Sequence, residues 1–429
     1  MSDPTLARRL TWIHGSAMAI GAVLGSGILI LPAVTAQEAG PAALMAWGLM
    51  AALSFPLAMT LGRLGSAYPH AGGIVEYVRV AWGPRAGRIT AWLFVGTIPL
   101  GVPIIALIGA HYAARAFFLP AWTIPGIAAG LLGGSLALHR RGVELAGWIQ
   151  VLVLALIATL IVAAIALASP HVQGIAFYPW APHGWVPIGT SAVAIFWCFV
   201  GWEMVGHLAE EFRHPARDLR RTFIIAPTLV GVLYLGLVVV TVGTHAYGAG
   251  HTLTPFSQLV QIGFGRVGAQ VTGVVALLIT AVAIHGNIAG FSRMVYSQAR
   301  AGVFPSWLAR MNPGYQTPTM ALHALAIDFA LVLTIDVVFH VNLQTLILGP
   351  STVFLVLYSL AMAAALKLLP SHGTRMRLLP GVALVICLAL MPFSGWVLLY
   401  PLGLAALGWA LSRPRAPDEV NEQRPRDGD

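Results

Sequence analysis

The hydrophobic pattern of the chain is a succession of long apolar runs separated by short polar connections. A helix crosses a bilayer with roughly 20 mainly apolar residues, and about twelve runs reach or approach this length. They cover residues 11–36, 41–64, 88–118, 121–139, 145–168, 190–209, 221–244, 269–298, 318–338, 343–369, 377–393 and 396–411. The last two are short and are joined through Pro392-Phe393-Ser394-Gly395. The pattern predicts an all-α integral membrane protein with about 12 transmembrane helices.

Two of these runs carry an interruption in the middle. The first contains Gly25-Ser26-Gly27-Ile28, and the sixth contains Phe199-Val200-Gly201-Trp202-Glu203. Glycine weakens a helix interior by about 1 kcal/mol relative to alanine. A carboxylate near the bilayer centre costs roughly 2.5–3.5 kcal/mol on insertion scales. Two such breaks, one in each half of a chain, are typical of the substrate site of a membrane transporter.

The spans divide into two halves of five, residues 11–168 and 190–369, and each half opens with an interrupted run. Because five is odd, the second half enters the membrane in the opposite orientation. This predicts a 5+5 inverted repeat in which broken helices 1 and 6 meet near the midplane. Two C-terminal helices (377–411) follow, and residues 1–10 and 412–429 are expected to be a cytoplasmic N-terminus and a disordered cytoplasmic tail.

Composition and charge agree with a membrane protein. The chain is 58% hydrophobic and 9% charged, with a mean hydropathy of +0.81, whereas a soluble domain carries about 25% charged residues. The net charge of +9 has a simple cause, because with a cytoplasmic N-terminus only Arg115 and Arg266 of the 24 Lys and Arg residues fall on the outer side. This is the positive-inside rule, and it removes the need for a nucleic-acid partner. We expect a multi-pass protein of a bacterial inner membrane.

Two other features of the chain add little. Arg8-Arg9, an apolar run and Val34-Thr35-Ala36 resemble a secretory signal, but the run is too long for one and is treated as a mature helix. Cys198 and Cys387 both lie inside spans and predict no disulfide framework.

Four stretches together resemble the amino acid–polyamine–organocation (APC) superfamily of secondary transporters, and within it the bacterial exporters of methionine and branched-chain amino acids. Any one stretch is weakly specific for this superfamily, but the order and topology of all four match its members. They are Gly25-Ser26-Gly27-Ile28 with Pro32, Tyr68-Pro69 with Ala71-Gly72-Gly73, Phe196 to Gly201 with Glu203 and His207 through Pro215, and Ser292-Arg293 to Pro305. The resemblance covers residues from about 10 to 410 and implies the leucine-transporter-like fold with helices 1 and 6 broken.

A broken helix exposes N–H groups at the start of one half and carbonyl groups at the end of the other. The N–H groups suit a carboxylate, and the carbonyl groups suit an ammonium. Similarity to arginine/agmatine antiporters implies that Val23, Ser26 and Gly27 hold the substrate carboxylate, with Gly25 and Ile28 beside them. It implies that Trp197 and Val200 carbonyls hold the amino group, with Phe199 and Gly201 adjacent and Trp197 as an aromatic gate. Alternatively, the glycines allow close helix packing and Trp197 is a core or lipid-facing aromatic.

The pocket for the substrate side chain is expected to come partly from the third span. Val102 stands where the arginine-handling relatives have asparagine, and Ile105 is close by. An apolar wall cannot compensate the desolvation of a charged side chain, which favours leucine, isoleucine, valine or methionine as substrate. Asn287 of the eighth span is a candidate polar pocket residue. The alternative is that the residues of the third span face lipid.

Glu203 is the acid that both the pattern and the resemblance put near the midplane. Desolvation disfavours its charged form, so it is a candidate proton carrier, and the alternative is a structural hydrogen bond that braces the break. Asp328, His285 and His323 also lie in spans and receive no assigned role. His207 and Glu210 form a His-x-x-Glu pair without a third ligand, so no metal or cofactor is expected.

The sequence thus predicts a secondary active transporter that exports neutral hydrophobic amino acids with proton antiport by alternating access. An importer or exchanger of the same fold is the first alternative, because topology does not set direction. A polytopic membrane enzyme is disfavoured because the chain shows no paired carboxylates, Ser/His/Asp set or His-x-x-x-His pattern. A channel or sensor remains a further alternative.

Overall fold

The computed structural model describes residues 11–68, 72–142, 147–202, 212–248, 253–300, 302–312, 314–315, 317–369 and 374–411. Within these ranges the elements are helices, and no strand element is present. Nine helical segments of the described chain are long and apolar enough to cross a membrane, and Trp12–Val23 and Val186–Phe199 are shorter apolar segments. The protein is therefore a multi-pass membrane protein.

The first part of the chain folds into eight α-helices joined by short connections and 3-10 turns. In chain order these are α1 (Trp12–Val23), η1 (Ser26–Leu29), α2 (Leu31–Ala39), η2 (Gly40–Ala42), α3 (Ala43–Ala67), α4 (Ile74–Trp82), α5 (Pro84–Val95), α6 (Thr97–Ala116), η3 (Ala121–Thr123), α7 (Ile124–Arg140) and α8 (Gly147–Ala168). Pro84 occupies the first turn of α5, where its missing N–H costs no intrahelical bond.

The second part follows after two short 3-10 turns, η4 (Ser169–His171) and η5 (Gly174–Phe177). Its elements are α9 (Val186–Phe196), η6 (Trp197–Phe199), α11 (Pro215–Gly243), α12 (Pro255–Arg300), η8 (Ser306–Ala309), α13 (Thr319–Phe339), α14 (Leu343–Leu368), α15 (Thr374–Leu390), η9 (Met391–Leu398) and α16 (Leu399–Leu411). Asn342 caps α14 by accepting a hydrogen bond from the N–H of Gln344 at 2.9 Å.

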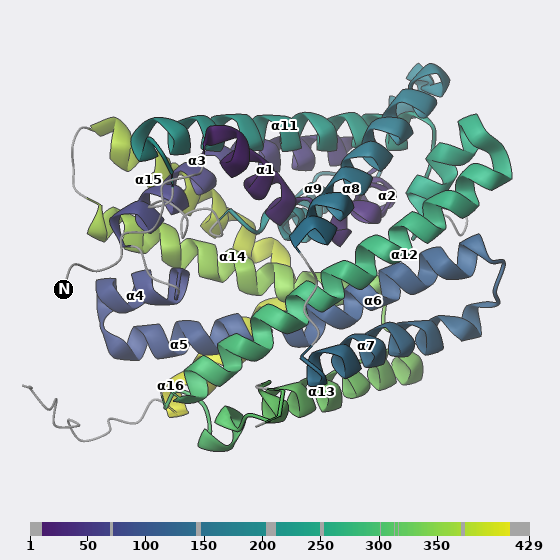
Figure 1. Cartoon of the computed structure of the whole chain (residues 1–429). Helices are drawn as coiled ribbons and strands as arrows, with labels where there is room; N and C mark the ends of the chain where they lie inside the picture. Colours follow the sequence, from purple (N-terminus) through teal and green to yellow (C-terminus); the bar gives the residue numbers. More distant parts are fainter. Residues whose placement is uncertain are drawn as a thin grey trace, which may run out of the picture.

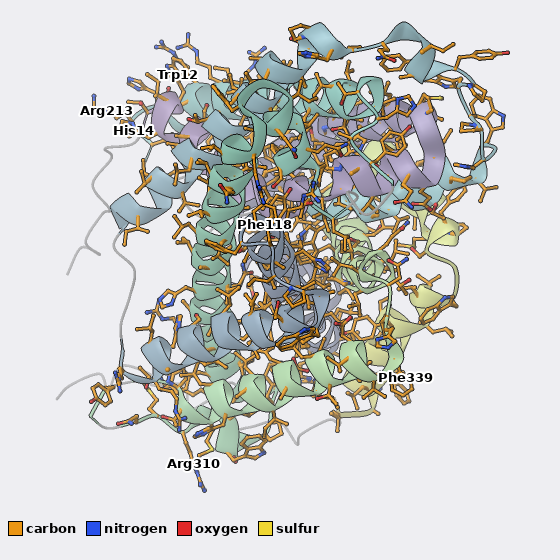
Figure 2. The ribbon with its side chains drawn as sticks, turned by 90° about the vertical axis from the view of Figure 1, so that its right-hand side faces the viewer. Trp12, His14, Phe118, Arg213, Arg310 and Phe339 are labelled. Carbon is orange, nitrogen blue, oxygen red and sulfur yellow. The ribbon has the colours of Figure 1, made fainter. Side chains whose placement is uncertain are left out.

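The long helices α11, α14, α6 and α13 run in roughly one direction, and α12 crosses obliquely in front of them (Figure 1). α12 packs against α6 and α8, and α11 packs against α3 and α1. At the start of α1, the Thr222 hydroxyl of α11 donates to the Trp12 carbonyl at 3.3 Å. Figure 2 shows Trp12, His14 and Arg213 gathered at one edge of the molecule. The core lies where α14, α9 and α3 meet, among fully buried aromatic side chains such as Trp47, Phe196 and Tyr358.

Several predicted boundaries were wrong. The run predicted at 269–298 begins at Pro255, because the helix continues through a kink at Gly265 (φ 57°). The run predicted at 88–118 begins at Pro84 and divides at Gly96. Helix α4 was not predicted at all. The turn expected at Pro392–Gly395 is present, with Gly395 at φ 55°.

Candidate functional site

The first predicted interruption is present. Helix α1 ends at Val23, and the Leu24 N–H closes its last turn on the Ile20 carbonyl at 2.7 Å. The N–H of Gly25 then turns back to the Val23 carbonyl at 2.7 Å, and the chain restarts at Ser26 as the 3-10 helix η1. A helix start leaves its first N–H groups without partners inside the helix. Ser26, Gly27 and Ile28 supply these groups, and all three residues are buried.

The second interruption is present as well. Helix α9 tightens into η6 at Trp197, and the next residue after η6, Val200, is extended (φ −88°, ψ 145°). Gly201 follows at φ +122°, a conformation that L side chains rarely adopt. Glu203, His207 and Glu210 lie outside the described residues.

The two interruptions meet at two pairs of residues. A Cβ built on Gly201 would lie 2.7 Å from the Ala22 carbonyl oxygen, so the turn after η6 lies against the end of α1. A Cβ built on Gly27 would lie 2.4 Å from Cδ1 of Trp197. Only glycine allows either approach, so these two glycines serve close contact between the broken segments. The junction therefore brings the N–H end of η1 beside the carbonyl ends of α1 and η6.

Three fully buried tyrosines bond the freed backbone groups, and the sequence analysis missed all of them. The Tyr234 hydroxyl of α11 lies 3.1 Å from the Val23 carbonyl oxygen and 3.4 Å from that of Cys198. The Tyr358 hydroxyl of α14 accepts the Gly201 N–H at 3.1 Å. The Tyr112 hydroxyl of α6 donates to the Leu29 carbonyl at 2.6 Å. Each of these tyrosines stands deep in an apolar span. A buried phenol needs a hydrogen-bond partner, so this position in the sequence could have indicated a bond to a freed backbone group.

Trp197 fills the space between the first interruption and α6. Its indole has Gly27 on one side, and a Cβ built on Gly101 would lie 2.7 Å from its Cη2 atom. Phe354 of α14 lies edge-on to it, with ring centroids 6.3 Å apart. Val102 and Ile105, which follow Gly101 on α6, are buried, and α6 packs against η1. The indole therefore lies at the junction, next to the apolar stretch of α6.

Two of the residues expected in the site make contacts that the sequence does not indicate. Phe199 is fully buried in an aromatic cluster, with its ring centroid 5.3 Å from Tyr234 and 6.3 Å from Trp47. The side-chain amide of Asn287 donates to the Ala283 carbonyl of its own helix at 2.8 Å. Phe199 therefore packs against Tyr234 and Trp47 beside the junction. One hydrogen bond of the Asn287 amide is formed within α12.

Three further ionisable residues that the sequence places in spans, His285, His323 and Asp328, lie within the described chain. His285 lies 3.3 Å from the Ser135 hydroxyl, and its ring centroid is 3.8 Å from that of His139. Arg140 donates to His323 at 2.7 Å. Oδ2 of Asp328 is buried and has no hydrogen-bond partner among the described residues. The part of the chain that the structure describes contains no group of three His, Cys, Asp or Glu residues able to hold a metal ion.

Glu38 links three helix ends near the two broken segments, and this also escaped the sequence analysis. Its carboxylate, on α2, accepts hydrogen bonds from the Thr190 hydroxyl, from the Ser191 hydroxyl at 3.3 Å and from the Gln344 amide at 2.5 Å. Thr190 and Ser191 belong to α9, and Gln344 begins α14. One acid thus ties the continuation of the first broken segment to the start of the second.

Comparison with known proteins agrees with this geometry. The amino acid permease family matches residues 10–409. The uncharacterized amino acid permease YecA of Bacillus subtilis (strain 168) is 47% identical over 95% of this chain and 96% of that protein. The L-methionine/branched-chain amino acid exporter YjeH of Escherichia coli (strain K12) is 32% identical over 96% and 98%, respectively. The branched-chain amino acid permease BcaP of B. subtilis is 24% identical over 92% and 90%. The chain therefore belongs to the amino acid permease family of the APC superfamily.

Proposed function

We propose that the protein is a proton-coupled secondary transporter that exports neutral hydrophobic amino acids, namely methionine, leucine, isoleucine and valine. One observation carries the proposal: the junction presents N–H groups of Ser26, Gly27 and Ile28 next to the carbonyl ends of α1 and η6. An α-amino acid carries a carboxylate and an ammonium on one carbon. Donors and acceptors at one junction suit both groups without a charged side chain.

The selectivity for an apolar side chain rests on α6 and Trp197. Val102 and Ile105 bring aliphatic groups to α6 beside the junction, and Trp197 adds an aromatic face. A cationic side chain would lose its hydration there with no counter-charge. YjeH is an exporter of methionine and branched-chain amino acids and BcaP is a branched-chain amino acid permease, which supports the same substrate class here.

The proposal includes a 5+5 inverted repeat, residues 11–168 and 190–369, in an inner membrane with both termini cytoplasmic. The matched positions of the two breaks and the asymmetry of Lys and Arg support it. Glu203 follows the second break and is proposed as the proton carrier. Glu203→Gln should abolish the pH dependence of transport, and an unchanged pH profile in that variant would exclude Glu203 from this role.

The experiment is counterflow of radiolabelled methionine and leucine in proteoliposomes at two pH values. Saturable, stereoselective exchange supports a carrier and opposes a channel or sensor. Transport in everted and right-side-out vesicles then separates export from import, which is the alternative for the same fold. The enzyme alternative is set aside by the family, whose relatives are permeases and transporters.

A further inference from the structure

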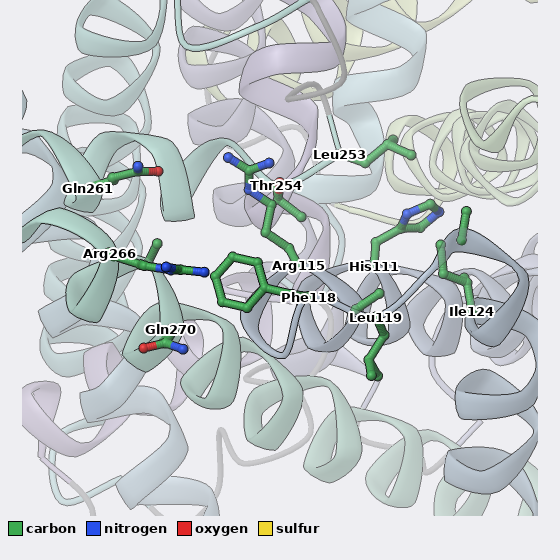
Figure 3. Close-up of a pocket in the computed structure, with 13 residues that line it drawn as sticks. His111, Arg115, Phe118, Leu119, Ile124, Leu253, Thr254, Gln261, Arg266 and Gln270 are labelled. Atoms are coloured by element: carbon green, nitrogen blue, oxygen red, sulfur yellow. The ribbon is translucent and has the colours of Figure 1, made fainter.

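A cavity of about 650 Å³ lies away from the junction, between the C-terminal end of α6, the start of α7 and the kink of α12. Its lining includes Arg115, Arg266, His111, Gln261 and Gln270. Figure 3 shows the Arg266 side chain of α12 ending at the Phe118 ring and the Arg115 guanidinium of α6 beside Thr254. These are the two cations that the sequence places on the outer side, and the structure brings both into one cavity.

The cavity carries positive charge without an acid to balance it. None of its 13 lining residues is Asp or Glu. Among the described residues, the ion pairs include neither Arg115 nor Arg266. The guanidinium carbon of Arg266 lies 4.1 Å from the centroid of the Phe118 ring, so a cation–π contact holds it in place. The edge of that guanidinium is left to bind an oxyanion.

Phe118 is held in an unusual backbone conformation. Its φ is +54°, in the left-handed region where a helix end normally has glycine. The Leu119 N–H closes the end of α6 on the Ala114 carbonyl at 2.8 Å. A bulky residue with positive φ carries strain that the surroundings must hold. In this conformation the aromatic ring lies under Arg266 and forms part of the cavity lining.

An exposed apolar stripe of α12 begins directly after Arg266. Val267, Val271, Val274 and Leu278 follow Arg266 at spacings of four, three and four residues, so they share one face of the helix. Their exposed fractions are 68%, 56%, 39% and 50%. Such a stripe on a membrane helix suits acyl chains rather than water. Arg266 directly precedes the first residue of this stripe, and Arg115 lines the same cavity as Arg266.

We propose that this cavity binds the phosphate headgroup of an anionic phospholipid, with Arg115 and Arg266 contacting the phosphate and an acyl chain lying along Val267 to Leu278. A soluble oxyanion, such as a free phosphate ester or an amino acid carboxylate, would use the same guanidinium groups. It would gain nothing from the stripe. The site is separate from the junction and does not depend on the transported substrate.

The test uses the full chain in detergent, with thermal stability measured during titration with phosphatidylglycerol, phosphatidylcholine or soluble glycerol phosphate. We expect phosphatidylglycerol alone to raise the melting temperature of the unmodified protein. Arg115→Gln and Arg266→Gln should each weaken its apparent affinity by about tenfold, the loss of roughly one charge-assisted contact. Arg310→Gln is the control, because Arg310 is exposed and lies at another edge of the molecule (Figure 2).

Phe118→Gly provides a variant that relieves the positive φ while removing the ring. It should fold, and it should also weaken the response to phosphatidylglycerol. Equal stabilisation by phosphatidylcholine would overturn the proposal. So would an equal effect of glycerol phosphate or of soluble methionine, or an unchanged lipid response in the double variant of Arg115 and Arg266.

Discussion

The Tyr234 hydroxyl lies 3.1 Å from the carbonyl oxygen of Val23, the last residue of α1. The same hydroxyl is 3.4 Å from the Cys198 carbonyl oxygen in η6. One phenol group from α11 therefore spans the two interruptions, which are about 175 residues apart in the sequence. Its single O–H can donate to either carbonyl oxygen, and its position between them fixes the distance between the two broken segments.

Removing this hydroxyl by Tyr234→Phe should weaken substrate binding more than folding. The loss of a buried hydrogen bond costs about 1–3 kcal/mol, so we expect KM to rise roughly 5- to 150-fold. The measurement is the concentration dependence of leucine counterflow in proteoliposomes. Tyr400→Phe is the matched control, because its hydroxyl donates to the Gly96 carbonyl at 2.6 Å and to neither broken segment. An equal rise of KM in both variants would contradict the assignment.

Gly101→Ala tests the position of the Trp197 indole. The added methyl group would lie 2.7 Å from Cη2 of Trp197, so the ring must move from its place beside Gly27. We expect transport to fall about tenfold, because a displacement of this kind costs on the order of 1–3 kcal/mol. Gly130→Ala on α7, where a Cβ meets open space, should leave transport unchanged. Normal transport in Gly101→Ala would exclude a tightly positioned gate.

Gly201→Ala should strongly destabilise the protein. Its φ of +122° is strained for alanine, and the new Cβ would also lie 2.7 Å from the Ala22 carbonyl oxygen. Strain alone costs about 1–3 kcal/mol, and the contact adds to it. Gly83→Ala separates the two effects, because Gly83 has φ +92° but open space around it. Melting temperatures should therefore fall further for Gly201→Ala, and equal losses would remove the role of the contact.

Glu38→Gln should loosen the link between α2, α9 and α14. The carboxylate accepts three side-chain hydrogen bonds. In the variant, the NH2 of the new amide would face side chains that are themselves hydrogen-bond donors. We expect a double-mutant cycle of Glu38→Gln with Gln344→Leu to give a coupling of about 0.5–3 kcal/mol. Thermal or denaturant unfolding of the four proteins measures it. Gln261→Leu changes a residue that lines the cavity of Arg115 and Arg266. When it is paired with Glu38→Gln, the two changes in the free energy of unfolding should simply add.

The interruptions could be predicted because they are local. Gly25 and Gly201 stand in the middle of apolar runs, where glycine weakens a helix, and both positions are non-helical. The aromatic Trp197 was also expected at the second break, and its indole lies against the first one. These features depend on the local backbone conformation and on the order of the spans, and both follow from neighbouring residues in the sequence.

The partners of the interruptions could not be predicted in the same way. Tyr234, Tyr358 and Glu38 each bond at least one residue more than 100 positions away, and only packing brings these residues together. The bond from the Asn287 amide to the Ala283 carbonyl could not be predicted either, because the sequence does not give the side-chain conformation, and the place of Asn287 in the pocket stays a prediction. Helix α4 was missed because the glycines before it suggested only a turn.

The most direct test of the account is whether both charged groups of the substrate are required. Competition against radiolabelled leucine is measured with leucine, N-acetyl-leucine, which lacks the ammonium, and leucinol, which lacks the carboxylate. Hydrogen bonds to charged groups are worth about 1.5–3 kcal/mol, so each analogue should compete roughly 10- to 100-fold more weakly. Competition by either analogue as strong as that of leucine would contradict recognition of the zwitterion at the junction of the two broken segments.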